Sequence, residues 1–587
     1  MKKANQTYLF ILFTGIISLV LCIGGNCISQ PLSLLLLHVN DTHSHIDPET
    51  YTVPINGVPT KIRLGGFDRL MTALNEERAR DKNILFLHAG DIFQGTLYFF
   101  EFQGQADEAF LNLMNLDAMV LGNHEFDRSS ALLAGFIDGA QFPALSANID
   151  VSADPVLRGK IVPFIIREVE GEKVGIIGLT TPDTTTISSP ESTVLFNFPV
   201  PGARAAVAEL EKQGINKIMV LSHLGVEEDI KLAQQVSGID VIVGGHSHTL
   251  MGNFSAFAYH TSYSYPLHQK DPDGKDVLIV QAWEWAKVLG KIRLTFDDAG
   301  NVVDDQPNPV FIVGEAFDQK WQDTNGDGQV NEKDAYTPVT QENAPDRYRS
   351  IVQYINQSGQ ARIFAEDPPG KQLRDRYCLN VQKLKGTVIA QSPVDLTRNG
   401  MNSGPGPLIA AGMLEKTAHM GAQMALLNPG GVRVDIPAGP VSISTVYDLI
   451  PFQSTLVLVT LTGQEMDNAL EDMVDFCLSE NGYGAGIYAY VAGVHFSLDL
   501  TSPRGQRVFD LKIRQKDGAY QTAQPQETYH LVTLNFLAEG GDKNLTLGKI
   551  QNKVDTGFVD ADVFMEYIKG KTLQEPSEEL VTLSSGD

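Results

Sequence analysis

Five short motifs place metal-binding side chains directly after apolar runs of the sequence. Between residues 41 and 248 they supply two carboxylates, one amide and five imidazoles. Two divalent ions held by such side chains can clamp a phosphoryl group and activate water. The sequence therefore predicts a two-metal hydrolytic centre. The motifs are Asp41-Thr42-His43, Gly90-Asp91, Gly122-Asn123-His124, Ser222-His223 and Gly245-His246-Ser247-His248.

The predicted metal ligands divide into two sets around one bridging carboxylate. Asp91 stands alone after Gly90 and is the candidate for the bridge. Mixed oxygen and nitrogen ligands fit manganese, zinc, iron or cobalt better than calcium. The first metal is expected to bind Asp41, His43 and His248, and the second is expected to bind Asn123, His223 and His246.

His124 has a different predicted role because it directly follows Asn123 and is expected to point away from the metal. Asp127 comes three residues later and can orient the imidazole. A histidine held by a carboxylate can stabilise developing negative charge or protonate a leaving oxygen. We therefore assign His124 and Asp127 to a catalytic dyad. The histidines interpreted as non-ligands are His38, His45 and His88.

The elements that must position these motifs alternate between strand-like and helical patterns over residues 32–314. Runs of Val, Ile and Leu between helical segments are typical of an α/β layered domain. Ligands of open α/β sheets bind beyond the strand ends, so the motifs are expected to converge at one edge. Strands are expected at 34–39, 84–88, 118–121, 173–179, 217–221, 241–243 and 277–281, and helices at 66–79 and 202–212.

The ordered set of motifs, with Gly-Asn-His-Glu-Phe-Asp at residues 122–127, resembles the calcineurin-like metallophosphoesterases. It is most similar to their 5'-nucleotidase branch, which includes periplasmic UDP-sugar hydrolases and surface ecto-nucleotidases. The resemblance implies a four-layer α/β/β/α metal domain, followed by a smaller α+β substrate-binding domain that rotates to carry substrate to the metals. It also implies release of phosphate from nucleoside 5'-phosphates by attack of a metal-bound hydroxide.

A glycine-rich segment in the second half of the chain is similar to a substrate-binding motif of that family. Asn428-Pro429-Gly430-Gly431-Val432-Arg433 matches the family's Asn-Gly-Gly-x-Arg, with Pro429 as an extra residue. The glycines allow a ligand to approach the backbone closely. Arg433 offers a planar fork for a phosphate or a carboxylate. We therefore expect Asn428, Gly431 and Arg433 to contact substrate.

Two aromatic motifs complete the resemblance in this region. Pro451-Phe452 and Asn535-Phe536, followed by Gly540-Gly541-Asp542, match the family. The resemblance implies that Phe452 and Phe536 sandwich the nucleobase and that Asp542 binds the ribose. Arg398 is a further substrate candidate. The family usually has two arginines near this point, but Arg398 is the sole basic residue of 398–407 in this sequence.

Residues 323–334 match a calcium loop of the EF-hand type. Oxygen ligands fall at loop positions 1, 3, 5 and 12, and a glycine falls at position 6. The sequence therefore predicts a structural calcium ion, with a flexible Asp/Gly loop as the alternative. The expected ligands are Asp323, Asn325, Asp327, the backbone carbonyl of Gln329, and Asp334.

The chain of 587 residues is long enough for two large domains. Its basic start and apolar stretch over 8–23 predict export by a signal peptide, with a membrane anchor or a lipid anchor at Cys22 or Cys27 as alternatives. The expected divisions are 1–30 for this segment, 31–317 for the metallophosphoesterase domain, 318–370 for a connector with the calcium loop and a helix over 345–365, 371–574 for the substrate domain, and 575–587 for a mobile tail.

The net charge of −26 argues against binding of DNA or RNA, because phosphate backbones need a basic surface. A small phosphorylated substrate remains compatible, since bound metals supply positive charge locally. Cys378 and Cys477 are expected either to pair or to remain free thiols. The sequence thus favours an exported, periplasmic or cell-surface, nucleotide phosphohydrolase. Hydrolysis of UDP-sugars or 2',3'-cyclic nucleotides, and non-catalytic nucleotide or calcium binding, are the alternatives.

Overall fold

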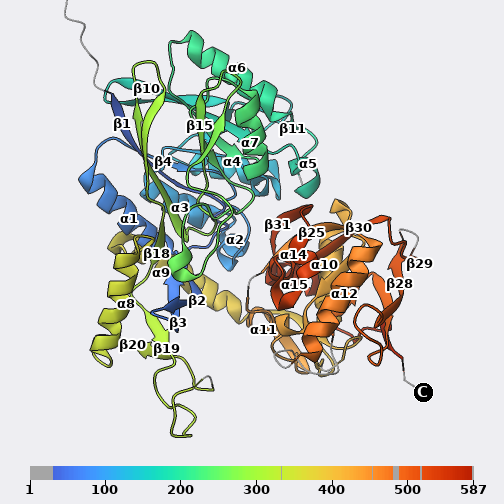
Figure 1. The fold of residues 1–587 in the computed structure, drawn as a ribbon. Coiled ribbons are helices and arrows are strands. Elements are labelled where there is room, and N and C mark those ends of the chain that lie inside the picture. The colour runs from blue at the N-terminus through green and yellow to red at the C-terminus, as the bar shows by residue number, and fades with distance from the viewer. Residues whose placement is uncertain are drawn as a thin grey trace, which may run out of the picture.

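The computed structural model describes residues 31–584 except 189, 332, 399, 453, 480–487 and 516–517. It contains two domains, and helix α9 (Pro368–Lys385) leads from the first to the second (Figure 1). The predicted export segment, residues 1–30, lies outside the described residues. Within the described part of the chain, no helix is both long enough and apolar enough to cross a membrane.

Two sheets packed face to face form the centre of the first domain. The inter-sheet core joins side chains such as Leu34 and Leu85 of one sheet to Ile176 and Leu221 of the other. Helices α1 (Phe67–Arg80) and α3 (Gln105–Leu113) cover one outer face, and α6 (Pro199–Lys212) and α7 (Val226–Gln235) cover the other. The predicted four-layer α/β/β/α architecture is confirmed. The strands that carry the motifs are β1 (Leu32–Val39), β4 (Ile84–His88), β5 (Ala118–Val120), β12 (Ile218–His223) and β13 (Val241–Gly244).

The continuous apolar run of β1 follows from burial on both faces of its sheet. Leu34 and Leu36 point into the inter-sheet core, whereas Leu35 and Leu37 pack against the helix layer. All four are at most 1% exposed. Burial of one leucine side chain contributes about 1.5–3 kcal/mol, so this strand is a strong anchor for the loop that follows it. β1 pairs in parallel with β4, and β4 pairs in parallel with β5.

The segment expected to connect the domains is partly built into the first domain. Strand β19 (Phe317–Gln319) pairs with β3 (Val58–Leu64) and with β20 (Thr337–Val339). Strand β21 (Ala361–Ile363) pairs in parallel with β18 (Val310–Val313). Isolated apolar residues in a polar segment gave no strand pattern, so the sequence analysis missed these pairings.

The single helix predicted over 345–365 is wrong at its carboxyl end. Helix α8 (Pro345–Ser358) stops at Gly359, whose φ of 68° closes the last turn in the left-handed conformation. Asp367 lies just before the next helix. Its side chain accepts a hydrogen bond from Gly370 N and caps the start of α9. The Asp-Pro-Pro-Gly sequence of residues 367–370 therefore begins the interdomain helix.

The second domain combines a mixed sheet with helices on both faces. Helix α12 (Gly463–Leu478) packs on one face, and α10 (Pro405–Thr417) and α15 (Asp560–Ile568) lie on the other. Cys378 and Cys477 are both free thiols. The strands of this sheet are β26 (Tyr490–Ala492), β23 (Met424–Leu427), β30 (Thr528–Leu534), β25 (Thr455–Thr462) and β31 (Lys553–Val559).

The segment predicted to be a mobile tail instead contains a short strand. Strand β32 (Val581–Leu583) pairs in parallel with β27 (Val494–Leu498) at the edge of a second, smaller sheet. Leu580 and Val581 are buried. The side chain of Asn402 accepts hydrogen bonds from both of their backbone N–H groups and so ties the tail to the domain.

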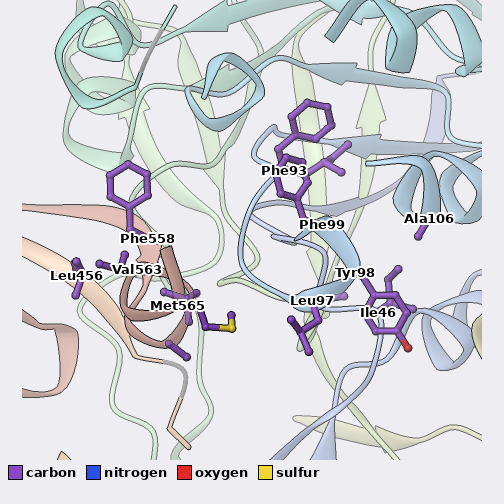
Figure 2. Packing of buried hydrophobic residues seen from close by; sticks show 14 of the residues in the cluster. Ile46, Phe93, Leu97, Tyr98, Phe99, Ala106, Leu456, Phe558, Val563 and Met565 are labelled. Atoms are coloured by element: carbon purple, nitrogen blue, oxygen red, sulfur yellow. The ribbon is translucent and has the colours of Figure 1, made fainter. Parts of the chain in front are cut away.

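Apolar and charged contacts join the two domains. Leu97 and Phe99 of the first domain belong to the same hydrophobic cluster as Phe558 and Met565 of the second (Figure 2). Nearby, Arg128 Nη2 lies 3.1 Å from Glu566 Oε1 of α15. The surface of the second domain that contains β31 and α15 therefore faces the motif loops of the first.

Candidate metal centre and catalytic dyad

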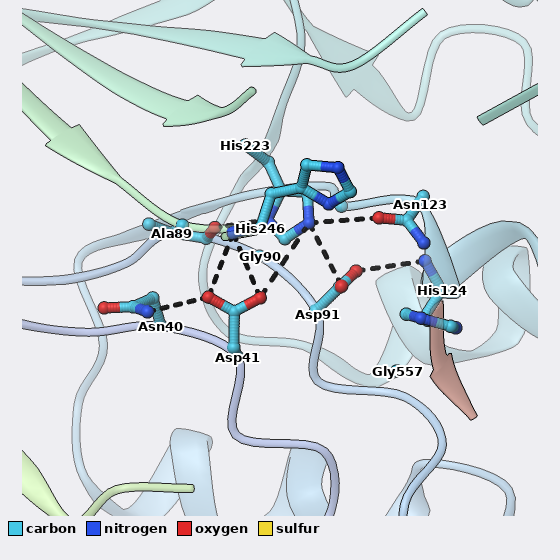
Figure 3. A network of polar contacts seen from close by, with 12 residues as sticks. Asn40, Asp41, Ala89, Gly90, Asp91, Asn123, His124, His223, His246 and Gly557 are labelled. Atoms are coloured by element: carbon cyan, nitrogen blue, oxygen red, sulfur yellow. Dashed lines mark hydrogen bonds and ion pairs between the residues drawn. The ribbon is translucent and has the colours of Figure 1, made fainter. Parts of the chain in front are cut away.

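The five sequence motifs converge where the parallel strands of the two sheets end. Asp41 and His43 follow β1, Asp91 follows β4 and Asn123 follows β5. From the second sheet, His223 ends β12, and the loop after β13 carries His246 and His248. All seven predicted ligands are thus brought together. Figure 3 shows the carboxylates of Asp41 and Asp91 facing His223 and Asn123.

The first cluster contains Asp41, His43 and His248. His43 Nε2 lies 3.2 Å from His248 Nε2, which in turn lies 3.3 Å from Asp41 Oδ1. Two ligand atoms that are each about 2.1 Å from one ion lie roughly 3.0–3.4 Å apart, so these spacings fit a divalent metal. The donor set also fits, since two imidazole nitrogens and a carboxylate oxygen converge.

The second cluster contains Asp91, His223 and His246. His223 Nε2 lies 3.1 Å from Asp91 Oδ2 and 3.2 Å from Asn123 Oδ1. Asp91 Oδ2 is also 3.9 Å from His43 Nε2 of the first cluster. Asp91 therefore lies between the two clusters, as a bridging ligand must.

Backbone carbonyls fix the orientation of two of the imidazoles. His43 Nδ1 donates to Phe93 O at 2.9 Å, and His223 Nδ1 donates to Ala89 O at 2.7 Å. A carbonyl can only accept, so the proton of each neutral ring lies on Nδ1 and the Nε2 lone pair faces the site. This is the tautomer that a metal ligand requires.

The electrostatics of the pocket favour a bound cation. Burial lowers the pKa of His43 to about 3 and that of His246 to about 4, so both rings stay neutral and able to bind metal. Burial also lowers the pKa of His223, but the Asp91 carboxylate outweighs it and raises that pKa to about 9. A metal ion beside Asp91 would satisfy the same demand for positive charge.

Five of the seven predicted ligands have a left-handed backbone conformation, which residues other than glycine rarely adopt. The φ angles of Asp41, His43, Asp91, His246 and His248 lie between 45° and 73°. Such left-handed residues cost of order 1 kcal/mol or more each and cluster at functional sites, where neighbouring structure holds them in place. Backbone strain at five of the seven predicted ligands is typical of a functional site.

The predicted dyad forms beside Asp91. His124 Nδ1 lies 2.5 Å from Asp127 Oδ2, and the backbone N–H of His124 donates to Asp91 Oδ1 at 3.0 Å. Burial lowers the pKa of His124, but Asp127 and Asp91 outweigh it and raise that pKa to about 9. The imidazole is therefore protonated at neutral pH and suited to donate a proton.

The second domain covers this dyad with a glycine. A Cβ atom on Gly557 of β31 would stand 2.4 Å from His124 Nε2. Phe558 contacts the same imidazole with its ring edge-on, 5.6 Å between centroids. Figure 3 shows Gly557 directly beside His124. In this arrangement the proton-donating edge of His124 faces protein rather than solvent.

The sequence analysis did not identify Glu125 as part of the site. Its buried carboxylate accepts hydrogen bonds from four backbone N–H groups and thereby shapes the loop that presents Asp91. Glu125 lies inside the Gly-Asn-His-Glu-Phe-Asp motif, which was the available signal. The four donors are Asp91, Ile92, Phe93 and Gly122.

The other histidines have structural partners. His38 Nε2 hydrogen-bonds the Tyr265 hydroxyl at 2.8 Å, and His88 Nε2 contacts Thr42 Oγ1 at 2.9 Å. His45 stacks on the indole of Trp285, with ring centroids 3.9 Å apart. The structure thus places none of these three in either metal cluster among the described residues.

The predicted substrate residues gather on the second domain, where the two phenylalanines are exposed and Asn428 is buried. Phe452 and Phe536 are 55% and 45% exposed. The guanidinium of Arg433 lies over the Phe452 ring at 5.6 Å, and Asn428 Nδ2 donates to Asp542 Oδ2 at 2.7 Å.

Two more predicted residues lie close to this group. Gly431 is packed against Asn428, since a Cβ atom there would lie 3.0 Å from Asn428 Oδ1. Arg398 donates to Val432 O at 3.3 Å. The phenyl rings of Phe452 and Phe536 are both about half exposed.

Comparison with known proteins agrees with these features. Residues 34–250 match the family described as calcineurin-like phosphoesterase, and residues 388–548 match the 5'-nucleotidase C-terminal domain. The probable 5'-nucleotidase of Treponema pallidum is 32% identical over 552 residues, covering 91% of each chain. The NAD 5'-nucleotidase of Haemophilus influenzae is 32% identical over 554 residues, covering 92% of this chain and 90% of that one.

Solved structures show the same two-domain fold. The structure of Haemophilus influenzae NAD nucleotidase superposes with a TM-score of 0.82 at 29% identity, covering 95% of this chain and 100% of that chain. Sequence and fold thus match over both domains. The chain belongs to the 5'-nucleotidase family of calcineurin-like metallophosphoesterases and is a metal-dependent phosphoric monoester hydrolase.

Proposed function

We propose that the chain releases phosphate from nucleoside 5'-phosphates, with His124 as the proton donor. The observation that carries this proposal is the position of the His124–Asp127 dyad beside Asp91, which lies between the two clusters. Manganese, zinc, cobalt or iron ions would supply positive charge for the phosphoryl oxygens and activate water. The residues that would hold them are Asp41, His43 and His248 at one site, Asn123, His223 and His246 at the other, and Asp91 between them.

Departure of the nucleoside requires a proton on its leaving oxygen. His124 is protonated at neutral pH, and Asp127 fixes its ring through Nδ1, so Nε2 is the donating atom. Gly557 lies against that atom in this structure. Substrate access to His124 therefore requires the second domain to move relative to the first.

The group of predicted substrate residues on the second domain, with its two exposed phenyl rings, supports a nucleotide as the substrate. We propose that Phe452 and Phe536 hold the base between their exposed faces and that Asp542 binds the ribose. Arg433, and beyond it Arg398, would bind the phosphate through their guanidinium forks. Aromatic faces tolerate any base, because stacking does not read hydrogen-bonding groups.

A phosphate-release assay over AMP, UDP-glucose, ATP and 2',3'-cyclic AMP tests this function. The purified chain is supplied with manganese, zinc or cobalt, and AMP is expected to be the preferred substrate. Preference for UDP-glucose or the cyclic nucleotide would move the assignment to another ester on the same scaffold. Absence of turnover on every substrate with every metal would leave a binding protein instead.

We also propose that residues 323–334 bind a structural calcium ion. Asp323, Asn325 and Asp327 accept hydrogen bonds from backbone N–H groups of the loop, as does Asp334. These bonds curl the loop, and a calcium ion would draw its side-chain oxygens and the Gln329 carbonyl toward one centre. Calcium should raise the melting temperature of the full chain but not that of Asp323→Ala. An equal effect of calcium on both would disprove the site.

Export remains part of the proposal. The basic start and the apolar stretch over 8–23 support cleavage of a signal peptide near residue 30. Intact-mass analysis of the protein recovered from its native host measures this directly. A mass corresponding to the full 587 residues would contradict cleavage.

A further inference from the structure

A fully buried lysine lies behind the first metal cluster. Lys287 is 0% exposed, and its ammonium donates to Glu284 Oε1 and to the Tyr51 hydroxyl at 3.0 Å. The same ammonium lies 3.6 Å and 4.3 Å from the ring centroids of Trp283 and Trp285. Burial of an ammonium is unfavourable by several kcal/mol, and a buried ion pair is weak support for stability. Its placement therefore calls for another explanation.

Glu284 connects this lysine to a metal ligand. One carboxylate oxygen, Oε1, contacts Lys287, and the other, Oε2, lies 2.7 Å from His248 Nδ1. The opposite ring nitrogen, His248 Nε2, lies 3.3 Å from Asp41 Oδ1 inside the first cluster. Lys287, Glu284 and His248 thus form a continuous line from the buried core of the domain to the metal site.

His248 differs in this respect from two other predicted ligands. His43 and His223 use Nδ1 to bond neutral backbone carbonyls, whereas His248 has a charged carboxylate behind it. A carboxylate behind a ligating imidazole fixes the ring orientation and raises the basicity of the ligand. His248 therefore has a charged residue behind its ring, which His43 and His223 lack.

The backbone that carries the pair is strained and tied to the ligand loop. Trp283, Trp285 and Ala286 have φ angles of 61°, 56° and 53°. Non-glycine residues in this region are unfavourable and need surrounding contacts to hold them. Trp285 N donates to Asp41 O at 2.8 Å, and the Asn40 side chain donates to Trp283 O. The turn that brings Glu284 to His248 is thus held by the same loop that presents Asp41.

We propose that Glu284 and Lys287 are positioning residues for His248 and set the affinity of the Asp41–His43–His248 cluster for its metal ion. Lys287 holds Glu284 in one orientation, and Glu284 holds the His248 ring with Nε2 toward the ion. This inference rests on the proposed two-metal site. It concerns metal binding, so it can be tested without any assay of turnover.

The test is calorimetric titration of zinc into the metal-free full chain. Glu284→Gln keeps the shape of the side chain but removes its charge, and Lys287→Met removes the anchor. Each should weaken one class of zinc site about 10- to 100-fold and leave the other class unchanged. Lys217→Met is the matched control, because Lys217 is a buried lysine that pairs with Glu172 elsewhere in the domain. It should leave both classes unchanged.

A second background separates positioning from general damage. If Glu284 acts through His248, Glu284→Gln should change zinc affinity little once His248→Ala is present. Three results would overturn the proposal. Glu284→Gln could bind zinc as tightly as the wild type, or it could lose affinity equally at both classes of zinc site. It could also lower zinc affinity by its full amount in the His248→Ala background. Glu284→Gln carries the test if Lys287→Met does not fold. If the wild type binds no zinc, the proposed function fails rather than the positioning role.

Discussion

His124 contacts two carboxylates, one through its imidazole and the other through its backbone N–H. Asp127 Oδ2 lies 2.5 Å from Nδ1 of the ring, while Asp91, which accepts the backbone N–H of His124, faces the metal clusters. In the proposed function, Asp127 therefore orients the proton donor, and Asp91 belongs to the metal site. The two carboxylates contact different atoms of the same residue, so the two roles can be changed separately.

Removal of the His124 side chain should separate catalysis from metal binding. His124→Ala is expected to lower turnover of a nucleotide roughly 100-fold or more, since general acid catalysis contributes on that scale. Metal content, measured by mass spectrometry of the dialysed protein, should match the wild type because His124 is outside both clusters. A variant that loses metal would show instead that His124 is a ligand.

The convergence of the candidate ligands could be predicted from the sequence because they lie in compact motifs next to apolar strands. Asp41 and His43, for example, directly follow β1, whose short and continuous apolar run is typical of a strand buried on both faces. Glu284 and Lys287 could not be found in this way. Their roles depend on a left-handed turn at Trp283 and Trp285, which no local pattern of side chains encodes.

Strand β32 was also missed because its formation depends on residues far away in the sequence. Strand β32 forms because Asn402, far away in the sequence, binds the backbone at Leu580 and Val581. Only three residues pair, which is too short a run for alternation to be recognised. Tertiary contacts, rather than propensity, decide such elements.

The exposed phenyl rings should govern affinity for the base alone. Phe452→Ala and Phe536→Ala are each expected to raise KM for AMP about 10-fold, because base–aromatic stacking contributes about 1–3 kcal/mol. Hydrolysis of ribose 5-phosphate, which has no base, should be unchanged. Phe198→Ala is the control, since Phe198 is 76% exposed in the other domain. An equal loss on both substrates would assign the rings to structure rather than to base binding.

Asp107 should make stability depend on pH in a defined direction. Its carboxyl is buried and accepts a hydrogen bond from Ser44 Oγ at 2.7 Å, and burial raises its pKa to about 7. In the unfolded chain the Asp107 carboxyl ionises near pH 3.9. Between pH 4 and 7 this carboxyl therefore binds more protons in the folded state than in the unfolded state. This group therefore stabilises the fold less as pH rises, by up to about 1.4 kcal/mol per unit.

Asp107→Asn removes this titration and keeps an acceptor for Ser44. In urea unfolding with a chelator present, the variant should gain stability relative to wild type between pH 5 and pH 8. Asp138→Asn, at a carboxyl that is 63% exposed, provides the comparison and should show a much smaller change. A pH-independent difference between Asp107→Asn and wild type would refute the assignment.

Gly557 should control access to His124. Its φ is 64°, and an added Cβ would stand 2.4 Å from His124 Nε2, so Gly557→Ala must displace β31 from the dyad. Gly505→Ala is the matched control, because Gly505 has a φ of 83° with nothing within 4 Å of an added Cβ. Both variants lose about 1–2 kcal/mol from left-handed strain. Diethyl pyrocarbonate acylates the small neutral fraction of the His124 imidazole, and this modification, read by mass spectrometry, should accelerate for Gly557→Ala alone. Equal rates in the two variants would mean that the contact with Gly557 does not shield the imidazole.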